Sequence, residues 1–106
     1  MTVIPGGYVN QEKLAGDVER VVRKLGPEVV RVKFDVGADP SDEPAIHFRI
    51  VLTDSASREE NLADVRERIT RIFFDDLRPY ENWGSRLYLS FRSQSEQSKR
   101  SDTAWA

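Results

Sequence analysis

The sequence contains no cysteine, and this absence excludes several kinds of site together. A disulfide scaffold, a thiolate zinc site, an iron-sulfur cluster and a cysteine nucleophile all require thiols. Histidine is nearly absent as well, because His47 is the only one in the chain. Any catalytic or metal-binding role therefore has to rest on other side chains, with this single imidazole among them.

The chain also lacks an excess of charge of one sign and a long hydrophobic run. Sixteen Lys and Arg stand against eighteen Asp and Glu, a formal net charge of -2, so any basic site must be local. The longest apolar runs are far shorter than the roughly 20 residues of a membrane-spanning helix, and the first seven residues form no basic leader. We expect a cytoplasmic protein without membrane contact.

The 106 residues, 39% hydrophobic and 32% charged, suit one globular domain and are too few for two independent cores. From residue 94 onward the chain is polar and shows no apolar period. We predict a single α/β domain over residues 1–93 and a polar, flexible C-terminal tail over 94–106. Trp105 is the exception in this tail, and it could anchor the tail on its own domain or on a neighbour.

Two segments have apolar residues at helical spacing. The first runs from Asn10 to Leu25 and is followed by Gly26-Pro27, which ends a helix firmly. The second follows Ser57, which has a capping-box spacing to Glu60, and it ends before Pro79. These patterns predict two amphipathic helices. Tyr80 and Trp83, in the turn after the second helix, are expected to cap the open end of the core.

Three segments alternate apolar and polar residues, which predicts strands with one buried face. They cover residues 30–36, 45–53 and 87–92, and an acidic loop over 37–44 joins the first two as a hairpin. In the first strand, Val30, Val32, Phe34 and Val36 are expected to face inward. The second strand is the most apolar, so we place it in the centre of the sheet with the third strand parallel to it.

The element order is thus α-β-β-α-β, which predicts an α+β fold. Each strand has one apolar face and each helix one apolar stripe, so both helices should pack on one face of a three-stranded sheet, as a two-layer α/β sandwich. The opposite face is predicted to be basic, with one aromatic residue. It carries Arg31, Lys33, Asp35, His47, Arg49, Val51, Tyr88, Ser90 and Arg92.

The order and lengths of these elements over residues 10–93 resemble the cytoplasmic C-terminal domain of cation-efflux transporters, a dimerising domain. That family typically ends its last strand with a metal-binding His, whereas Phe91-Arg92-Ser93 stands there in this chain. Metal sensing is therefore not implied. The order is also similar to the type II KH topology, but the Gly-x-x-Gly clamp of that family is absent. The chain is assigned to neither family.

The predicted basic face has three interpretations. It could be a solvated surface whose Arg and Lys stems lie across the sheet. It could bind nucleic acid, although RNA-reading sheets normally display two or three aromatic residues and only Tyr88 is expected to face outward here. It could also pair with a protein, either a second copy or another chain. The candidate partner-binding residues are Arg31, Lys33, His47, Arg49, Tyr88, Arg92 and Trp105.

Catalysis is not favoured. His47 could act as a base, with Ser90 and Asp35 on the same face, but no serine lies within the glycine pattern of a nucleophile elbow. Gly6-Gly7 lacks the remaining residues of a nucleotide-binding loop, so no cofactor is expected. Two acidic clusters could hold a hard cation in principle, but the loop lacks the ligand order of an EF-hand, so no metal site is predicted. The clusters are Asp39, Asp42 and Glu43, and Asp75 with Asp76.

We therefore favour a small non-enzymatic protein-interaction module, a homodimer or a small subunit of a larger complex. It would use the exposed sheet face, a sheet edge and the C-terminal tail. A nucleic-acid-binding domain that uses the basic face is the first alternative. A small enzyme centred on His47 is the second.

Overall fold

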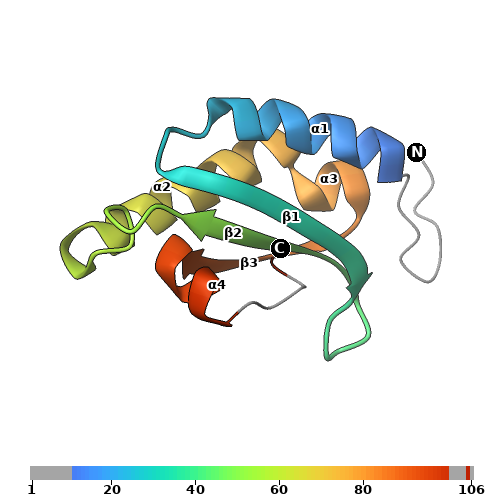
Figure 1. The fold of residues 1–106 in the computed structure, drawn as a ribbon. Helices are drawn as coiled ribbons and strands as arrows, with labels where there is room; N and C mark the ends of the chain where they lie inside the picture. The colour runs from blue at the N-terminus through green and yellow to red at the C-terminus, as the bar shows by residue number, and fades with distance from the viewer. Residues whose placement is uncertain (1–10, 101–104, 106) are drawn as a thin grey trace.

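A computed structural model of the protein describes residues 11–100 and residue 105. This part of the chain holds four helices and one three-stranded sheet (Figure 1). The elements are α1 (Gln11–Lys24), β1 (Val29–Ala38), β2 (Pro44–Leu52), α2 (Glu59–Leu77), α3 (Pro79–Trp83), β3 (Arg86–Ser93) and α4 (Gln94–Arg100). The predicted α+β class and the order of the five main elements are confirmed, and the short helices α3 and α4 are additions to it.

The strand order in the sheet is β1-β2-β3. β1 pairs with β2 antiparallel, and β2 pairs with β3 parallel. The expected central position of β2 is therefore confirmed. The central strand is also the most buried of the three, because it has a neighbouring strand on both sides and helices over one face.

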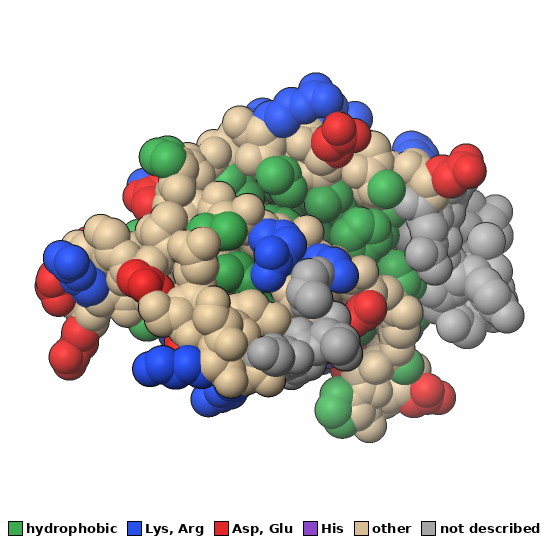
Figure 2. All heavy atoms as spheres, viewed as in Figure 1, with side chains coloured by type: hydrophobic (Ala, Val, Ile, Leu, Met, Phe, Trp, Pro, Cys, Tyr) green, Lys and Arg blue, Asp and Glu red, His purple; other side chains and the backbone are tan. Residues whose placement is uncertain are grey.

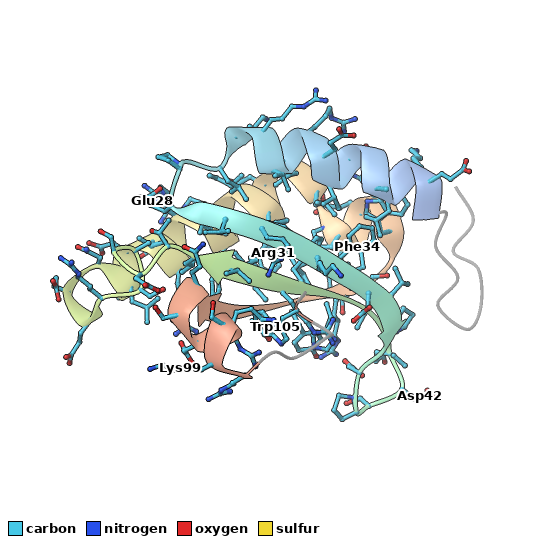
Figure 3. All side chains as sticks on the ribbon, viewed as in Figure 1. Glu28, Arg31, Phe34, Asp42, Lys99 and Trp105 are labelled. Carbon is cyan, nitrogen blue, oxygen red and sulfur yellow. The ribbon has the colours of Figure 1, made fainter. Side chains whose placement is uncertain are left out.

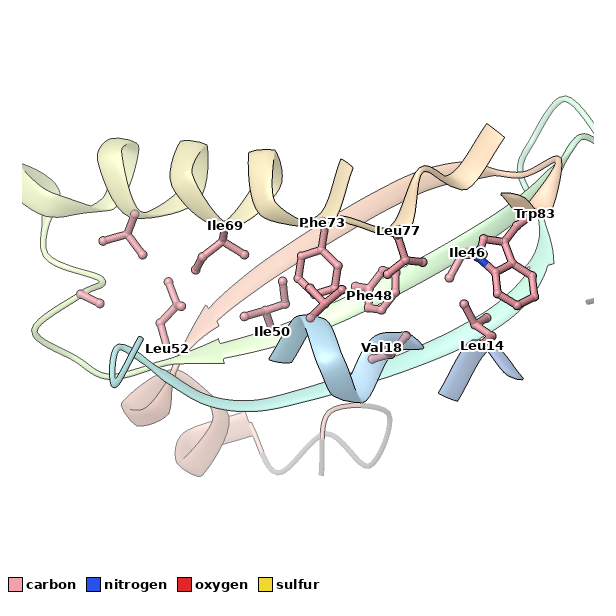
Figure 4. Packing of buried hydrophobic residues seen from close by; sticks show 13 residues of the cluster. Leu14, Val18, Ile46, Phe48, Ile50, Leu52, Ile69, Phe73, Leu77 and Trp83 are labelled. Carbon is pink, nitrogen blue, oxygen red and sulfur yellow. The ribbon is translucent and has the colours of Figure 1, made fainter. Parts of the chain in front are cut away.

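The hydrophobic core lies between the sheet and helices α1 and α2 (Figure 4). Phe48 of β2 is at its centre, with its ring 4.5 Å from that of Phe73 in α2 and 5.8 Å from that of Phe34 in β1. Ile50 is fully buried beside it. Burial of a side chain of this size stabilises the fold by roughly 1.5–3 kcal/mol. The core thus holds both helices against the same face of the sheet, as the alternation of the strands predicted.

The first strand differs from its expected course at its start. The register shifts between Val29 and Arg31, so Val30 is an extra residue at a β-bulge. Val30 is 41% exposed, and Val29 packs against the core in its place. The predicted inward position of Val30 is therefore wrong, because a bulge breaks the alternation on which that prediction depended.

The start of α2 also differs from the prediction. The cap residue is Arg58, which makes no side-chain capping bond, and the Ser57 hydroxyl has no hydrogen-bond partner within the described residues. The predicted capping box is therefore wrong. Instead, Thr53 accepts a bond from the Ala56 N–H, and Asn61 donates to the Ser55 carbonyl. These bonds shape the turn between β2 and α2.

The other end of α2 is closed by a left-handed residue. Arg78 has a φ of 47°, and Pro79 then begins α3. Trp83 is 5% exposed and caps the end of the core as expected, whereas Tyr80 is 64% exposed, so its predicted capping role is wrong. Within the described part of the chain, no helix has both the length and the apolarity needed to cross a bilayer.

Candidate functional site

The outer face of the sheet is the face opposite α1 and α2, and the strand register arranges its side chains in three rows. The first row is Asp35, His47 and Tyr88, the second is Lys33, Arg49 and Ser90, and the third is Arg31, Val51 and Arg92. The structure therefore brings all the predicted sheet residues of the candidate site to one face. What these residues contact within the chain decides how much of the face is available to a partner.

In the first row, the His47 ring stacks on the Tyr88 ring at 5.1 Å. Asp35 lies opposite His47, but its carboxylate pairs with Arg49 of the neighbouring row. Ser90 lies opposite Arg49 rather than His47. The three residues considered for catalysis therefore share a face without forming a relay from acid to base to nucleophile.

Tyr88 also connects the sheet to the hairpin loop. Its hydroxyl donates to the Asp39 carboxylate at 3.0 Å, and the backbone N–H groups of Ser41 and Glu43 donate to the other oxygen of the same carboxylate. The Glu43 N–H, together with the Tyr88 hydroxyl and the Ser41 N–H, holds the pKa of Asp39 below its ordinary value, against the opposing effect of desolvation. Asp39 is thus a structural anion that organises the loop.

The acidic loop does not form a metal site in the described residues. No group of three or more His, Asp or Glu side chains in this part of the chain is placed to hold a cation. Asp39, which was one of the candidate ligands, uses its carboxylate for the loop contacts and lies 3.7 Å from the Arg86 guanidinium. Asp75 and Asp76 are at the end of α2, where Asp76 pairs with Lys24 of α1 at 2.6 Å.

The third row holds the C-terminal tryptophan. Trp105 is 8% exposed, and the Arg92 guanidinium lies over its ring at 4.3 Å. Arg31 donates two hydrogen bonds, of 3.0 and 3.2 Å, to the Trp105 carbonyl oxygen. Figure 3 shows Arg31 and Trp105 together on this side of the sheet. Of the two positions left open by the sequence, the structure has Trp105 on its own domain, against Arg31 and Arg92 of the third row.

Residues 94–100, which were expected to lack regular structure, form α4 directly after β3. The Asp54 carboxylate accepts bonds from the backbone N–H and the hydroxyl of Ser95, and these bonds lower the pKa of Asp54. Arg92 donates to Gln97 in the same helix. The short polar helix has no buried residue of its own. Its contacts depend on residues of distant segments, so an apolar period could not have predicted it.

The charges on the outer face are therefore largely engaged within the chain. Arg49 pairs with Asp35, and Arg31 and Arg92 bind Trp105. Lys33 is exposed and forms no ion pair with the described residues. The basic face predicted from the sequence exists, but most of its cations already contact an anion, a carbonyl oxygen or an aromatic ring.

A second feature, which the sequence reasoning mentioned only as a sheet edge, lies beside this face. Only β2 pairs with β1, so along the other edge of β1 no described strand forms hydrogen bonds. Partly buried apolar side chains of β1 and of the end of α1 pack against the core, and Figure 2 shows hydrophobic atoms at the surface between α1 and β1. We call this set the β1 strip. It consists of Val22, Leu25, Val29, Val32, Phe34 and Val36.

The position of α1 explains why the β1 strip is not fully covered. Lys24 pairs with Asp76 of α2, and Lys13 lies 5.8 Å from the Trp83 ring in α3. These contacts hold one flank of α1 toward α2 and α3. Val22 lies on a different side of α1 and stays half-buried against the core. The sequence did contain a sign of this strip, because Val21 and Val22 are adjacent in α1. A helix that buries one face needs an apolar residue at only one of these two positions.

Comparison of the chain with protein-family models, with curated proteins and with solved structures gives no match. We therefore assign it to no family.

Proposed function

We propose that the protein is a non-enzymatic, cytoplasmic protein-interaction module that binds its partner along the edge of β1. One observation carries this proposal: the outer edge of β1 pairs with no described strand, and the same strand carries most of the half-buried apolar side chains of the β1 strip. The outer face, with Lys33 at its border, flanks the same edge. The three features together form one continuous surface.

The chemistry of this surface suits an extended partner segment. An edge strand presents backbone N–H and C=O groups without partners, so an added strand can form a ladder of hydrogen bonds with it. Alternate side chains of the added strand would then cover the β1 strip. Each apolar group removed from water stabilises the complex by about 25 cal/mol per Å² of buried area. The ladder provides affinity for any strand, and the strip selects partners with apolar residues at every second position.

The outer face contributes less to this proposal than the sequence suggested. Trp105 lies at the third row, where Arg31 and Arg92 both contact it. A partner on β1 would meet the first two rows, where Lys33 and Asp35 are exposed at the strand itself. His47, Arg49 and Tyr88 lie further in and would border the complex.

Nucleic-acid binding through the same face is the second candidate. In its favour, four cationic side chains of the face lie on three adjacent strands. Against it, three of these cations contact other groups of the chain, and the Tyr88 ring stacks on His47. Base stacking would have to displace that imidazole.

Photo-crosslinking tests the proposed binding edge. A photoreactive amino acid at position 33 in β1 is illuminated in extract of the source cells, and a second protein with the same amino acid at position 67 serves as control. Both native side chains are exposed, and Glu67 lies on the outer side of α2. We expect a protein adduct from position 33 and none from position 67. An absence of adducts at position 33, or equal adducts at both positions, would refute the proposal.

A further inference from the structure

We infer that the partner on the β1 edge is a second copy of this chain, with the two β1 strands antiparallel about a two-fold axis at Phe34. The inference rests on the proposed function and specifies its partner. The result is a continuous six-stranded sheet with the helices of both copies on one side. A two-fold axis makes each contact occur twice, so the strand must be complementary to itself.

Side-chain direction restricts the possible registers first. Opposed residues of an antiparallel pair point to the same face of the sheet, and successive residues of a strand point to opposite faces. In β1, Val32 and Phe34 face the core while Lys33 faces outward. A register that opposes Lys33 to Phe34 would put charge into the apolar strip. The two-fold axis must therefore pass through a residue and not between two residues. Only then do core-facing side chains oppose core-facing ones and outward side chains oppose outward ones.

Charge then selects one of the remaining registers. With the axis at Phe34, Lys33 of each copy lies opposite Asp35 of the other, so two opposite-charge pairs form. Val32 lies opposite Val36 of the second copy, and Phe34 lies opposite itself. Every apolar side chain therefore faces another apolar side chain in this register. The pairing can extend over residues 31–37, up to the bulge at Val30.

The neighbouring registers each place like charges together. An axis at Val32 sets Lys33 opposite Arg31 of the second copy, and an axis at Lys33 sets that residue opposite itself. An axis at Asp35 sets the Asp35 carboxylates of the two copies opposite each other. Like charges directly opposed across two strands are destabilising. An axis at Lys33 also sets Arg31 opposite Asp35, but at the cost of the Lys33 pair at its centre. Among axes at residues 32–35, only Phe34 gives attraction on the outer face without opposing like charges.

The edge of β3 does not offer the same surface. The Arg66 guanidinium lies 5.4 Å from the ring of Phe91, so a charged group of α2 lies beside this strand. Self-pairing of β3 about its middle residue Leu89 would set Arg86 opposite Arg92 of the second copy. A charged side chain over an edge is a usual protection against strand pairing. The β1 edge, with apolar groups beneath it, is the one suited to a second copy.

Light scattering on a sizing column tests the state of the wild-type protein. We expect a particle of 24.4 kDa, twice the 12.2 kDa of one chain, at micromolar to millimolar concentrations. A 12.2 kDa particle over this whole range would overturn the second-copy inference. It would leave the proposed function standing if position 33 still gives adducts of another mass. No adduct at position 33 overturns both.

Charge reversal tests the register. Lys33→Asp and Asp35→Lys should each raise the dissociation constant of the dimer by on the order of 10- to 100-fold, because both ion pairs become repulsive. An equal mixture of the two variants should restore a dimer that contains one of each, since the reversed charges then face opposite ones. Arg71→Asp and Glu67→Lys change the net charge equally on α2 and should not alter the dimer. Failure of the mixture to associate would overturn the register.

A disulfide test reads the register from covalent linking and does not depend on the effect of a reversed charge. The chain has no cysteine, so Lys33→Cys and Asp35→Cys each carry one thiol. In the proposed register these thiols face each other across strands, where Cα atoms about 4.5–5.5 Å apart permit a disulfide. A mild copper-phenanthroline oxidant should link the mixed variants, each thiol losing one electron and one proton. A mixture of Lys33→Cys with Glu67→Cys should not link. Equal linking in both mixtures would overturn the register.

Discussion

Asp39 is a nearly buried carboxylate, 6% exposed, whose contacts join the hairpin loop to β3. It accepts bonds from the Ser41 and Glu43 N–H groups and from the Tyr88 hydroxyl. These donors favour the charged form, so the folded protein binds a proton at this site less tightly than the unfolded chain. This carboxylate therefore stabilises the fold at pH values above its unfolded pKa. The contribution is lost as the pH falls through the lower pKa of the folded state.

We expect Asp39→Asn to lower the melting temperature at about pH 7 and to matter less at about pH 3, which is below the ordinary pKa of an aspartate in the unfolded chain. The amide keeps one acceptor oxygen, but it removes the charge that strengthens three hydrogen bonds. Thermal unfolding of both proteins at the two pH values measures the difference. Asp54 and Glu28 also have lowered pKa values, but they are common to both proteins and cancel. A difference between the two proteins that does not change with pH would contradict this role.

At the scale of single residues, the sequence predicted the face of the sheet on which a side chain lies better than it predicted the contacts of that side chain. The alternation of the strands correctly placed Lys33, His47 and Arg49 on the outer face. It could not predict that Arg31 binds the carbonyl of Trp105, because these residues are 74 positions apart and meet only when the tail returns to the sheet. The error at Val30 has a similar origin, since a bulge depends on how two strands pair and not on the residues of one.

Among the elements, α1 has two neighbouring valines with different roles. Val21 is 2% exposed and packs in the core, whereas Val22 is half-buried on the flank beside the β1 edge. The first valine holds the helix on the sheet. The second belongs to the β1 strip, which a partner covers in the proposed complex.

We expect Val21→Ala to lower the free energy of unfolding by about 2 kcal/mol, through lost burial and the cavity left behind. Val22→Ala should cost less than about 1 kcal/mol in the isolated chain, because its side chain is partly solvated already. It should instead weaken association along β1. Urea unfolding at low protein concentration and sizing at high concentration measure the two effects separately. If Val22→Ala destabilises the monomer as much as Val21→Ala does, the division of roles is wrong.

A helix or strand could be predicted from the sequence where the pattern of its own side chains is sufficient to define it. Both long helices and all three strands follow from apolar periods, and the parallel pairing of β2 with β3 follows from the helix that connects them. The short helices were not predictable in this way. α3 depends on Arg78 in a left-handed conformation before Pro79, and α4 depends on Asp54, which lies 41 residues before its Ser95 partner.

For the whole molecule, the balance of charge opposes strong binding to phosphate backbones. The formal net charge is -2, and three of the four cations of the outer face contact other groups of the same chain. The edge of β1 is instead the place where unused hydrogen-bonding capacity and apolar area coincide. A protein partner uses both features, whereas a nucleic acid uses neither.

A titration with single-stranded oligonucleotides at about 50 and 200 mM salt separates the two candidates. We expect little binding at either concentration. Tight binding at the lower salt that falls steeply at the higher would favour the nucleic-acid alternative, since phosphate contacts release counterions. Substituting Arg49 and Lys33 by Gln would then have to remove that binding.

The two edges of the sheet are unlike, and this difference limits how large an assembly can grow. A sheet that offers equivalent edges on both sides can add copies without end and form fibrils. In the proposed dimer the β1 side receives the second copy, and the other side carries the Arg66 guanidinium near the Phe91 ring. Once two receptive sides have met about a two-fold axis, none remains, so the oligomer is closed and polymerisation stops.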